Sequence, residues 1–162
     1  MSKQPAFDLD KAHHWFGVEY NNSIFPLLEK ENRSAEETEK MIAMAFASTL
    51  HWKSYSKHTP ANSARGEYMI STVSAYAGRK EDALHYALRS YDTVWRNKIV
   101  TADFDLSYAL MALARAYALN GDMDNAQRYY GECESSIKLI KREEDKKIVL
   151  MDINSGPWYG LK

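Results

Sequence analysis

One segment of this chain occurs twice, and this internal repeat constrains the fold more than any other feature. Aligning Gly78 with Gly121 offsets the two copies by 43 residues. The same offset pairs further apolar residues: Ala75 with Ala118, Ile70 with Leu113, and Ala83 with Ala126. A repeated unit that ends at a glycine in both copies indicates a supersecondary element whose apolar face is buried only when neighbouring copies stack.

Helix start signals divide the chain into hairpins. Ser34 with Glu37 forms a capping box, and Thr59 followed by Pro60 combines a capping hydroxyl with a proline in the first turn. The expected helices span about residues 8–30 with a bend at Pro26, then 34–56, 60–77, 80–97, 103–120, 122 into the 130s, and a short helix within 143–151. No stretch alternates with the period of a strand, so the sequence predicts an all-α fold of about six long helices and a short C-terminal one.

The chain is expected to form one domain over residues 1–151. The predicted hairpins are about 8–57, 60–97 and 103–140, and a closing helix follows at about 143–151. The segment 152–162 is unusually aromatic for a terminus because it carries Trp158 and Tyr159 behind a Gly-Pro turn. We expect it either to fold back on the array or to dock on a neighbouring chain, and an ordinary disordered end is the alternative.

Charge and cysteine content narrow the classes of partner. The 21 basic and 22 acidic residues leave a net charge of −1, which disfavours nucleic acid and anionic membranes as partners. The start of the chain is polar and its longest apolar run, 41–50, is too short to span a bilayer, so a cytoplasmic location is predicted. The single Cys133 stands where the repeat takes a small buried residue, which predicts an unreactive thiol.

The second copy of the repeat has the spacing of a known family. Its apolar and small residues run Leu110, Leu113, Ala114, Tyr117, Gly121, Ala126 and Tyr130. This order resembles the tetratricopeptide repeat (TPR), in which antiparallel helical hairpins stack as a right-handed array. The resemblance implies such an array here, with a longer second helix or exit loop in the first copy, because the offset exceeds the family's period of about 34 residues.

The whole chain is also similar to a group of small bacterial TPR-like proteins of unassigned activity. The similarity rests on His14-Trp15, residues 27–30, 48–52, 64–67, 103–106 with Tyr108-Ala109, and 143–145. It implies a helical-hairpin array and names no substrate.

In such an array the first helix of each hairpin lines the concave face. That face is predicted to carry two arginines among tyrosines and smaller side chains: Arg65, Tyr68, Thr72, Tyr76, Tyr108, Met111 and Arg115. Two guanidinium groups in this setting suit a carboxylate or another anion. The alternative is that Tyr68 and Tyr108 pack between hairpins while the arginines pair with Glu67, Asp103 or Asp105.

Two catalytic alternatives have weaker support. His13 or His14 with His51 and Glu19 could hold a metal in a helical-bundle enzyme of the DinB kind, although no tight ligand spacing accompanies them. Arg79 and His85 loosely match a pattern of some helical ribonucleases. No glycine-rich phosphate loop is present, and we assign no catalytic residue, metal site or cofactor from the sequence.

These observations predict a non-enzymatic module that binds a protein or a peptide. Its partner could be a second copy, since arrays need their ends covered. Trp15, Phe16, Trp95 and the aromatic segment 152–162 are the candidates for such a contact in a homodimer.

Overall fold

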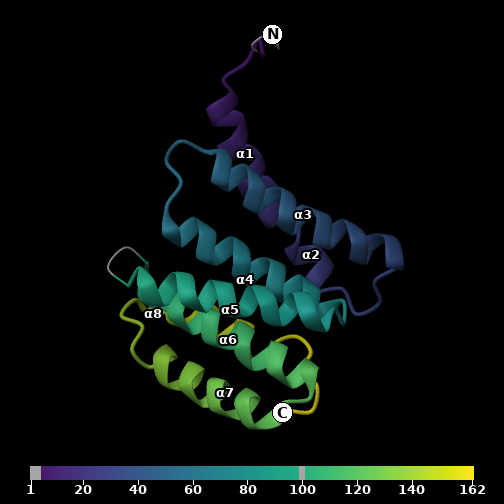
Figure 1. The fold of residues 1–162 in the computed structure, drawn as a ribbon, viewed down its shortest axis with the longest axis vertical. Coiled ribbons are helices and arrows are strands. Elements are labelled where there is room, and N and C mark those ends of the chain that lie inside the picture. Colours follow the sequence, from purple (N-terminus) through teal and green to yellow (C-terminus); the bar gives the residue numbers. More distant parts are fainter. Residues whose placement is uncertain (1–4, 99–100) are drawn as a thin grey trace.

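The computed structural model describes residues 5–98 and 101–162, and within these ranges the chain is helical and contains no strand. The helices are α1 (Leu9–Asn22), α2 (Phe25–Leu28), α3 (Ala35–Ser54), α4 (Pro60–Tyr76), α5 (Lys80–Arg96), α6 (Asp103–Asn120), α7 (Met123–Ile137) and α8 (Glu143–Ile153). The pairs α1–α3, α4–α5 and α6–α7 follow one another along the molecule (Figure 1). Helix α6 also packs against α4 and α8. The predicted all-α fold is therefore confirmed.

Local capping explains where the long helices begin. The Ser34 hydroxyl accepts the Glu37 amide at 3.1 Å, and the Glu37 carboxylate accepts the Ser34 amide at 2.9 Å. Thr59 and Asn62 make the same reciprocal pair at the start of α4. Each pair satisfies amide groups that have no partner inside the helix, so both predicted starts are confirmed.

Two boundaries, the end of the first helix and the end of the last, differ from the prediction, whereas the expected start at residue 103 is confirmed. The first helix ends at Asn22 rather than near residue 30, and Pro26 lies in the first turn of the separate α2, where its missing amide costs no helical hydrogen bond. Helix α6 begins at Asp103, with the Asp105 carboxylate accepting the Ala102 amide at 2.9 Å. Helix α8 continues to Ile153, two residues beyond the expected end.

The two copies of the repeat have the same helix ending. Gly78 and Gly121 both adopt left-handed backbone, with φ of 72° and 82°. The residue after each glycine donates its amide to a carbonyl five positions back, Arg79 to Ser74 at 2.9 Å and Asp122 to Tyr117 at 3.0 Å. A side chain would be strained at that φ, so the two glycines end α4 and α6 in the same way and form the turns within two equivalent hairpins, α4–α5 and α6–α7.

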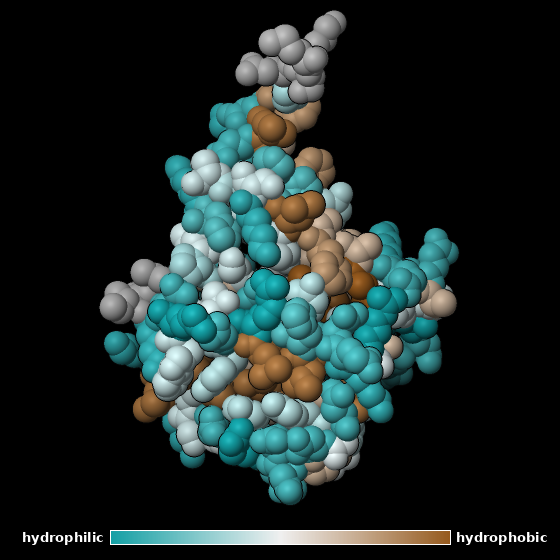
Figure 2. Space-filling model, in the orientation of Figure 1, coloured by the Kyte–Doolittle hydropathy of each residue, from teal (hydrophilic) through white to brown (hydrophobic). Residues whose placement is uncertain are grey.

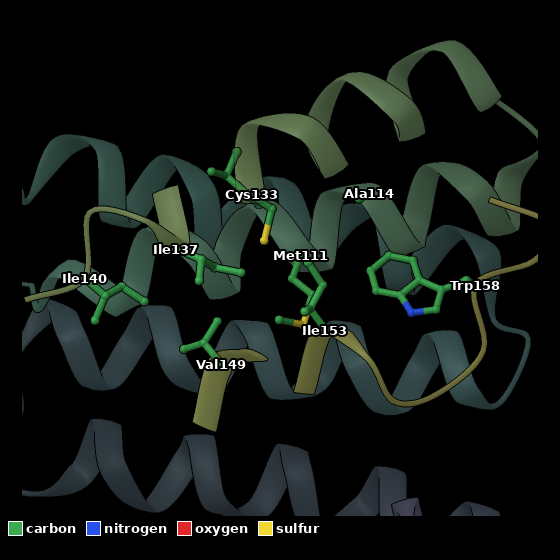
Figure 3. Packing of buried hydrophobic residues seen from close by; sticks show 9 residues of the cluster. Met111, Ala114, Cys133, Ile137, Ile140, Val149, Ile153 and Trp158 are labelled. Atoms are coloured by element: carbon green, nitrogen blue, oxygen red, sulfur yellow. The ribbon is translucent and has the colours of Figure 1, made fainter. Parts of the chain in front are cut away.

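The C-terminal segment completes the core. Trp158 is 5% exposed and belongs to one apolar cluster with residues of α6, α7 and α8. Figure 3 shows Met111, Cys133, Ile137, Val149, Ile153 and Trp158 pointing into this interior. Of the three expectations for this segment, folding back on the helices is the one observed.

Helices α3 and α4 approach closely at Gly66. A Cβ there would lie 2.6 Å from Thr49 Oγ1, and Thr49 is buried with its hydroxyl bonded to the Ala45 carbonyl at 2.9 Å. Gly131, in α7, has open space around its Cα. The two glycines therefore offer a matched pair of substitutions.

We predict that Gly66→Ala destabilises the protein by about 1–3 kcal/mol, because the buried Thr49 side chain must move. Gly131→Ala should instead stabilise it by about 0.5–1 kcal/mol through the higher helix propensity of alanine. Urea denaturation of both variants measures the two free energies of unfolding. Equal effects would contradict the close approach of α3 and α4.

Candidate functional site

A cavity of about 970 Å³ lies against α4 and α6. Residues 25–33, which include α2, form one side of it, and residues 151–159 of the C-terminal segment contribute another. Six of the seven predicted concave-face residues line this central cavity: Arg65, Tyr68, Thr72, Tyr76, Tyr108 and Arg115. Met111 does not, because its side chain is fully buried in the core behind Tyr68.

Arg65 is held by a carboxylate of the chain itself. Its Nε and Nη2 donate to the two oxygens of the buried Asp105 at 2.8 and 3.0 Å, and its guanidinium lies 5.0 Å from the Phe104 ring centroid. Pairing with Asp105 is one of the alternatives that the sequence left open. Glu67, another of them, pairs with Arg89 instead at 2.8 Å.

Tyr68 and Tyr108 pack against each other with their ring centroids 4.9 Å apart. The Tyr108 hydroxyl donates to Asp152 Oδ2 at 2.7 Å. Burial raises the pKa of Tyr68 to about 12, and burial together with the bond to Asp152 raises the pKa of Tyr108 further. Both phenols are therefore neutral hydrogen-bond donors at physiological pH.

Arg115, unlike Arg65, is buried without a carboxylate partner in the described part of the chain. It is 2% exposed, and among the described residues no carboxylate oxygen lies within 4.0 Å of it. Its Nη2 donates to the Ser155 carbonyl at 3.0 Å, and its guanidinium lies 4.5 Å from the Trp158 ring and 5.4 Å from the Tyr76 ring. Arg115 Nε has no hydrogen-bond partner, and neither has the buried Thr72 hydroxyl.

Other cavity residues were not predicted from the sequence. Arg33 Nη1 donates to the carbonyls of Leu27 and Lys30, both at 2.9 Å, and thereby holds the turn after α2 in place. Tyr159 donates its hydroxyl to the Ala75 carbonyl. The aromatic composition of residues 152–162 singled that segment out, but which surface it would cover depends on contacts with residues far away in the chain.

A second, shallower groove of about 510 Å³ lies mainly between the second helices of the two repeated hairpins, α5 and α7. Tyr91 and Trp95 of α5, Leu106 and Leu110 of α6, and part of α7 line it. Figure 2 shows hydrophobic residues reaching the surface between α5 and α7. Trp15 and Trp95 are about half exposed, as a role in self-association requires, and that role stays a prediction.

The histidines of the metal alternative are only partly brought together. The Nδ1 atoms of His13 and His51 lie 2.9 Å apart, whereas His14 packs on Trp52 and Tyr55. Among the described residues no group of three or more potential metal ligands is close enough to share an ion.

The other residues that the sequence singled out, Arg79, His85 and Cys133, each contact residues of the chain itself. Arg79 pairs with Glu39 of α3, and the His85 ring packs edge-to-face against Tyr86. Cys133 is fully buried and its thiol donates to the Ser107 carbonyl at 3.2 Å; burial raises its pKa to about 12. The predicted burial of Cys133 is confirmed, and a buried neutral thiol is expected to be a poor nucleophile.

Comparison of the chain with protein-family models, curated proteins and solved structures returns no match. Across residues 5–98 and 101–162, each helix is too short or too polar to cross a membrane. Because no comparison returns a match, the cavity is interpreted from its own geometry.

Because Trp158 links the cavity wall to the core, we predict that Trp158→Ala lowers the free energy of unfolding by about 3–5 kcal/mol. The half-exposed Trp95 supplies the control, and Trp95→Ala should cost less than about 1 kcal/mol. Urea denaturation gives both values. A Trp158→Ala variant as stable as the wild type would show that the C-terminal segment is not docked.

The contact between His13 and His51 predicts a pH dependence of stability. Burial, and then the neighbouring His13, lower the pKa of His51 below its ordinary value of 6.5. The unfolded chain therefore binds more protons than the folded one as the pH falls below about 6.5, so this contribution to stability is present above that pH and is lost below it. Thermal unfolding at pH 7.5 and 5.5 should show a smaller acid loss for His51→Gln than for the wild type, whereas the exposed His85→Gln should behave as wild type.

Proposed function

We propose that this chain is a non-enzymatic, TPR-like binding module whose central cavity receives a segment of a partner protein or a peptide. The observation that carries the proposal is the cavity itself, because it combines a size of about 970 Å³ with six aromatic side chains and with polar and charged side chains between them. Binding sites for compact ligands have volumes of about 300–1,000 Å³ and combine apolar and aromatic walls with polar groups that fix the orientation of the ligand. A right-handed stacking of the three hairpins is part of the proposal.

The walls of the cavity supply the apolar contacts. Phe25 of α2 and Phe104 of α6 line it, and Tyr159 contributes from the C-terminal segment. Aromatic side chains bury a large apolar area with few rotatable bonds, so they contribute strongly to peptide binding. Arg65 is paired with the buried Asp105 but its side chain stays about half exposed, so its remaining N–H groups can donate to main-chain carbonyls of the partner.

The proposal is tested by selecting binders from a displayed library of random peptides on the immobilised protein. We expect selection to yield peptides with a shared motif, and Phe25→Ala to weaken the best of them about tenfold by removing a cavity wall. Phe46→Ala is the matched control because Phe46 is 40% exposed, against 42% for Phe25, and does not line the cavity.

Phe46→Ala should change the affinity less than about twofold. Failure to enrich any peptide, or an equal loss in the two variants, would contradict peptide binding in the cavity.

A further inference from the structure

Two polar groups that line the cavity lack hydrogen-bond partners. Arg115 Nε and Thr72 Oγ1 are both buried without one, in side chains that are 2% and 4% exposed. Buried polar atoms are almost always paired in folded proteins, and exceptions often mark functional sites. Among the described residues four buried side-chain polar atoms lack a partner, and these two belong to residues that line the same cavity.

We infer that Arg115 and Thr72 form a subsite within the cavity that binds a single carboxylate. The inference deepens the proposed function, on which it rests for the peptide origin of the ligand. The two residues are 43 positions apart, the offset of the internal repeat, so they occupy equivalent positions on the adjacent helices α4 and α6.

Of the basic residues that line the cavity, Arg115 is the one best placed to bind an anion. Lys30 and Arg65 already hold carboxylates of the chain. Arg33 donates to main-chain carbonyls and is only partly buried, so water reaches it. Arg115 is the more deeply buried cation, and a desolvated charge without a counterion is unfavourable until an anion joins it.

The surroundings of the guanidinium favour approach in its plane. Trp158 and Tyr76 rings lie within 5.4 Å of it, and aromatic rings attract a guanidinium through its faces. Its N–H groups point outward in the plane, where a planar carboxylate accepts best. The Ser155 carbonyl takes one of them and leaves others available.

A carboxylate fits the charge of the site better than a phosphate does. Asp152 lines the same cavity, accepts the Tyr108 hydroxyl at 2.7 Å and has no basic partner within 4.0 Å among the described residues. A dianion would be repelled by this carboxylate more strongly than a monoanion, and one negative charge is balanced by Arg115 alone. The ligand we expect therefore joins one carboxylate to an aromatic or aliphatic group that contacts the walls.

The subsite is tested by titrating the protein with 3-phenylpropionate, with the neutral 3-phenylpropionamide and with inorganic phosphate, using calorimetry and the Arg Nε–H resonances. We expect the carboxylate to bind about tenfold more tightly than the amide and to shift the Arg115 Nε–H resonance. Phosphate should bind more weakly than the carboxylate.

Variants localise the effect. Arg115→Gln should weaken 3-phenylpropionate about tenfold and Thr72→Val about threefold, by loss of a charged and a neutral hydrogen bond. Arg96→Gln is the control, because Arg96 is an exposed arginine that is paired with Asp92 and does not line the cavity, and it should change the affinity less than about twofold. If Arg115→Gln does not fold, Thr72→Val and the wild-type resonance decide the question.

Equal binding of the acid and the amide, or tighter binding of phosphate, would overturn the subsite. So would an Arg115 resonance that does not move at saturation, or an unchanged affinity in a folded Thr72→Val variant. The absence of any carboxylate binding up to about 20 mM would also overturn it, because titration to that concentration detects dissociation constants in the millimolar range.

The origin of the carboxylate is distinguished with acetyl-Phe-Glu-amide and acetyl-Phe-Gln-amide. Preference for the Glu peptide assigns the carboxylate to a peptide side chain, as the proposed function requires. Binding of 3-phenylpropionate without either peptide would support the subsite and contradict peptide binding. Selected library peptides that bind regardless of carboxylates would support the proposed function and overturn the subsite.

Discussion

The burial of α6 on several sides is the constraint on which the rest of the molecule depends. This helix contacts α4, α5, α7 and α8, and its residues from Ala109 to Ala116 are all buried. Alanines at 109, 112, 114 and 116 allow the neighbouring helices to approach closely. Because Arg115 lies within this stretch, its side chain is buried and its charge is largely shielded from water.

The C-terminal segment links stability to the cavity. Trp158 fills the space between α6, α7 and α8, while the carbonyl of Ser155, three residues before it, accepts from Arg115. Asp152 meets Tyr108 from the end of α8. The groups that would bind a ligand are therefore positioned by the same segment that closes the core, and a ligand at Arg115 would be sensitive to how that segment is held.

Much of the helical organisation could be predicted because its determinants are local. The hydroxyls of Ser34 and Thr59 bond amides three residues away, and Gly78 and Gly121 supply a left-handed residue where two helices stop. The repeat also predicted which faces of α4 and α6 would line a cavity, since equivalent positions in stacked hairpins face the same way. Met111 was assigned to that face and is buried instead, because hairpin position alone does not distinguish a residue beneath the tyrosines from one beside them.

The sequence by itself determined the all-α fold, most helix starts, the equivalent helix ends and the burial of Cys133, because each depends on residues within a few positions or on a repeated apolar pattern. Only the tertiary structure decided that Arg65 is neutralised by Asp105 while Arg115 meets a carbonyl, since each bond joins residues 40 positions apart. The same holds for the contact of His13 with His51, 38 positions apart. Whether a buried charge finds a counterion is set by how separate helices come together, and no local pattern records it.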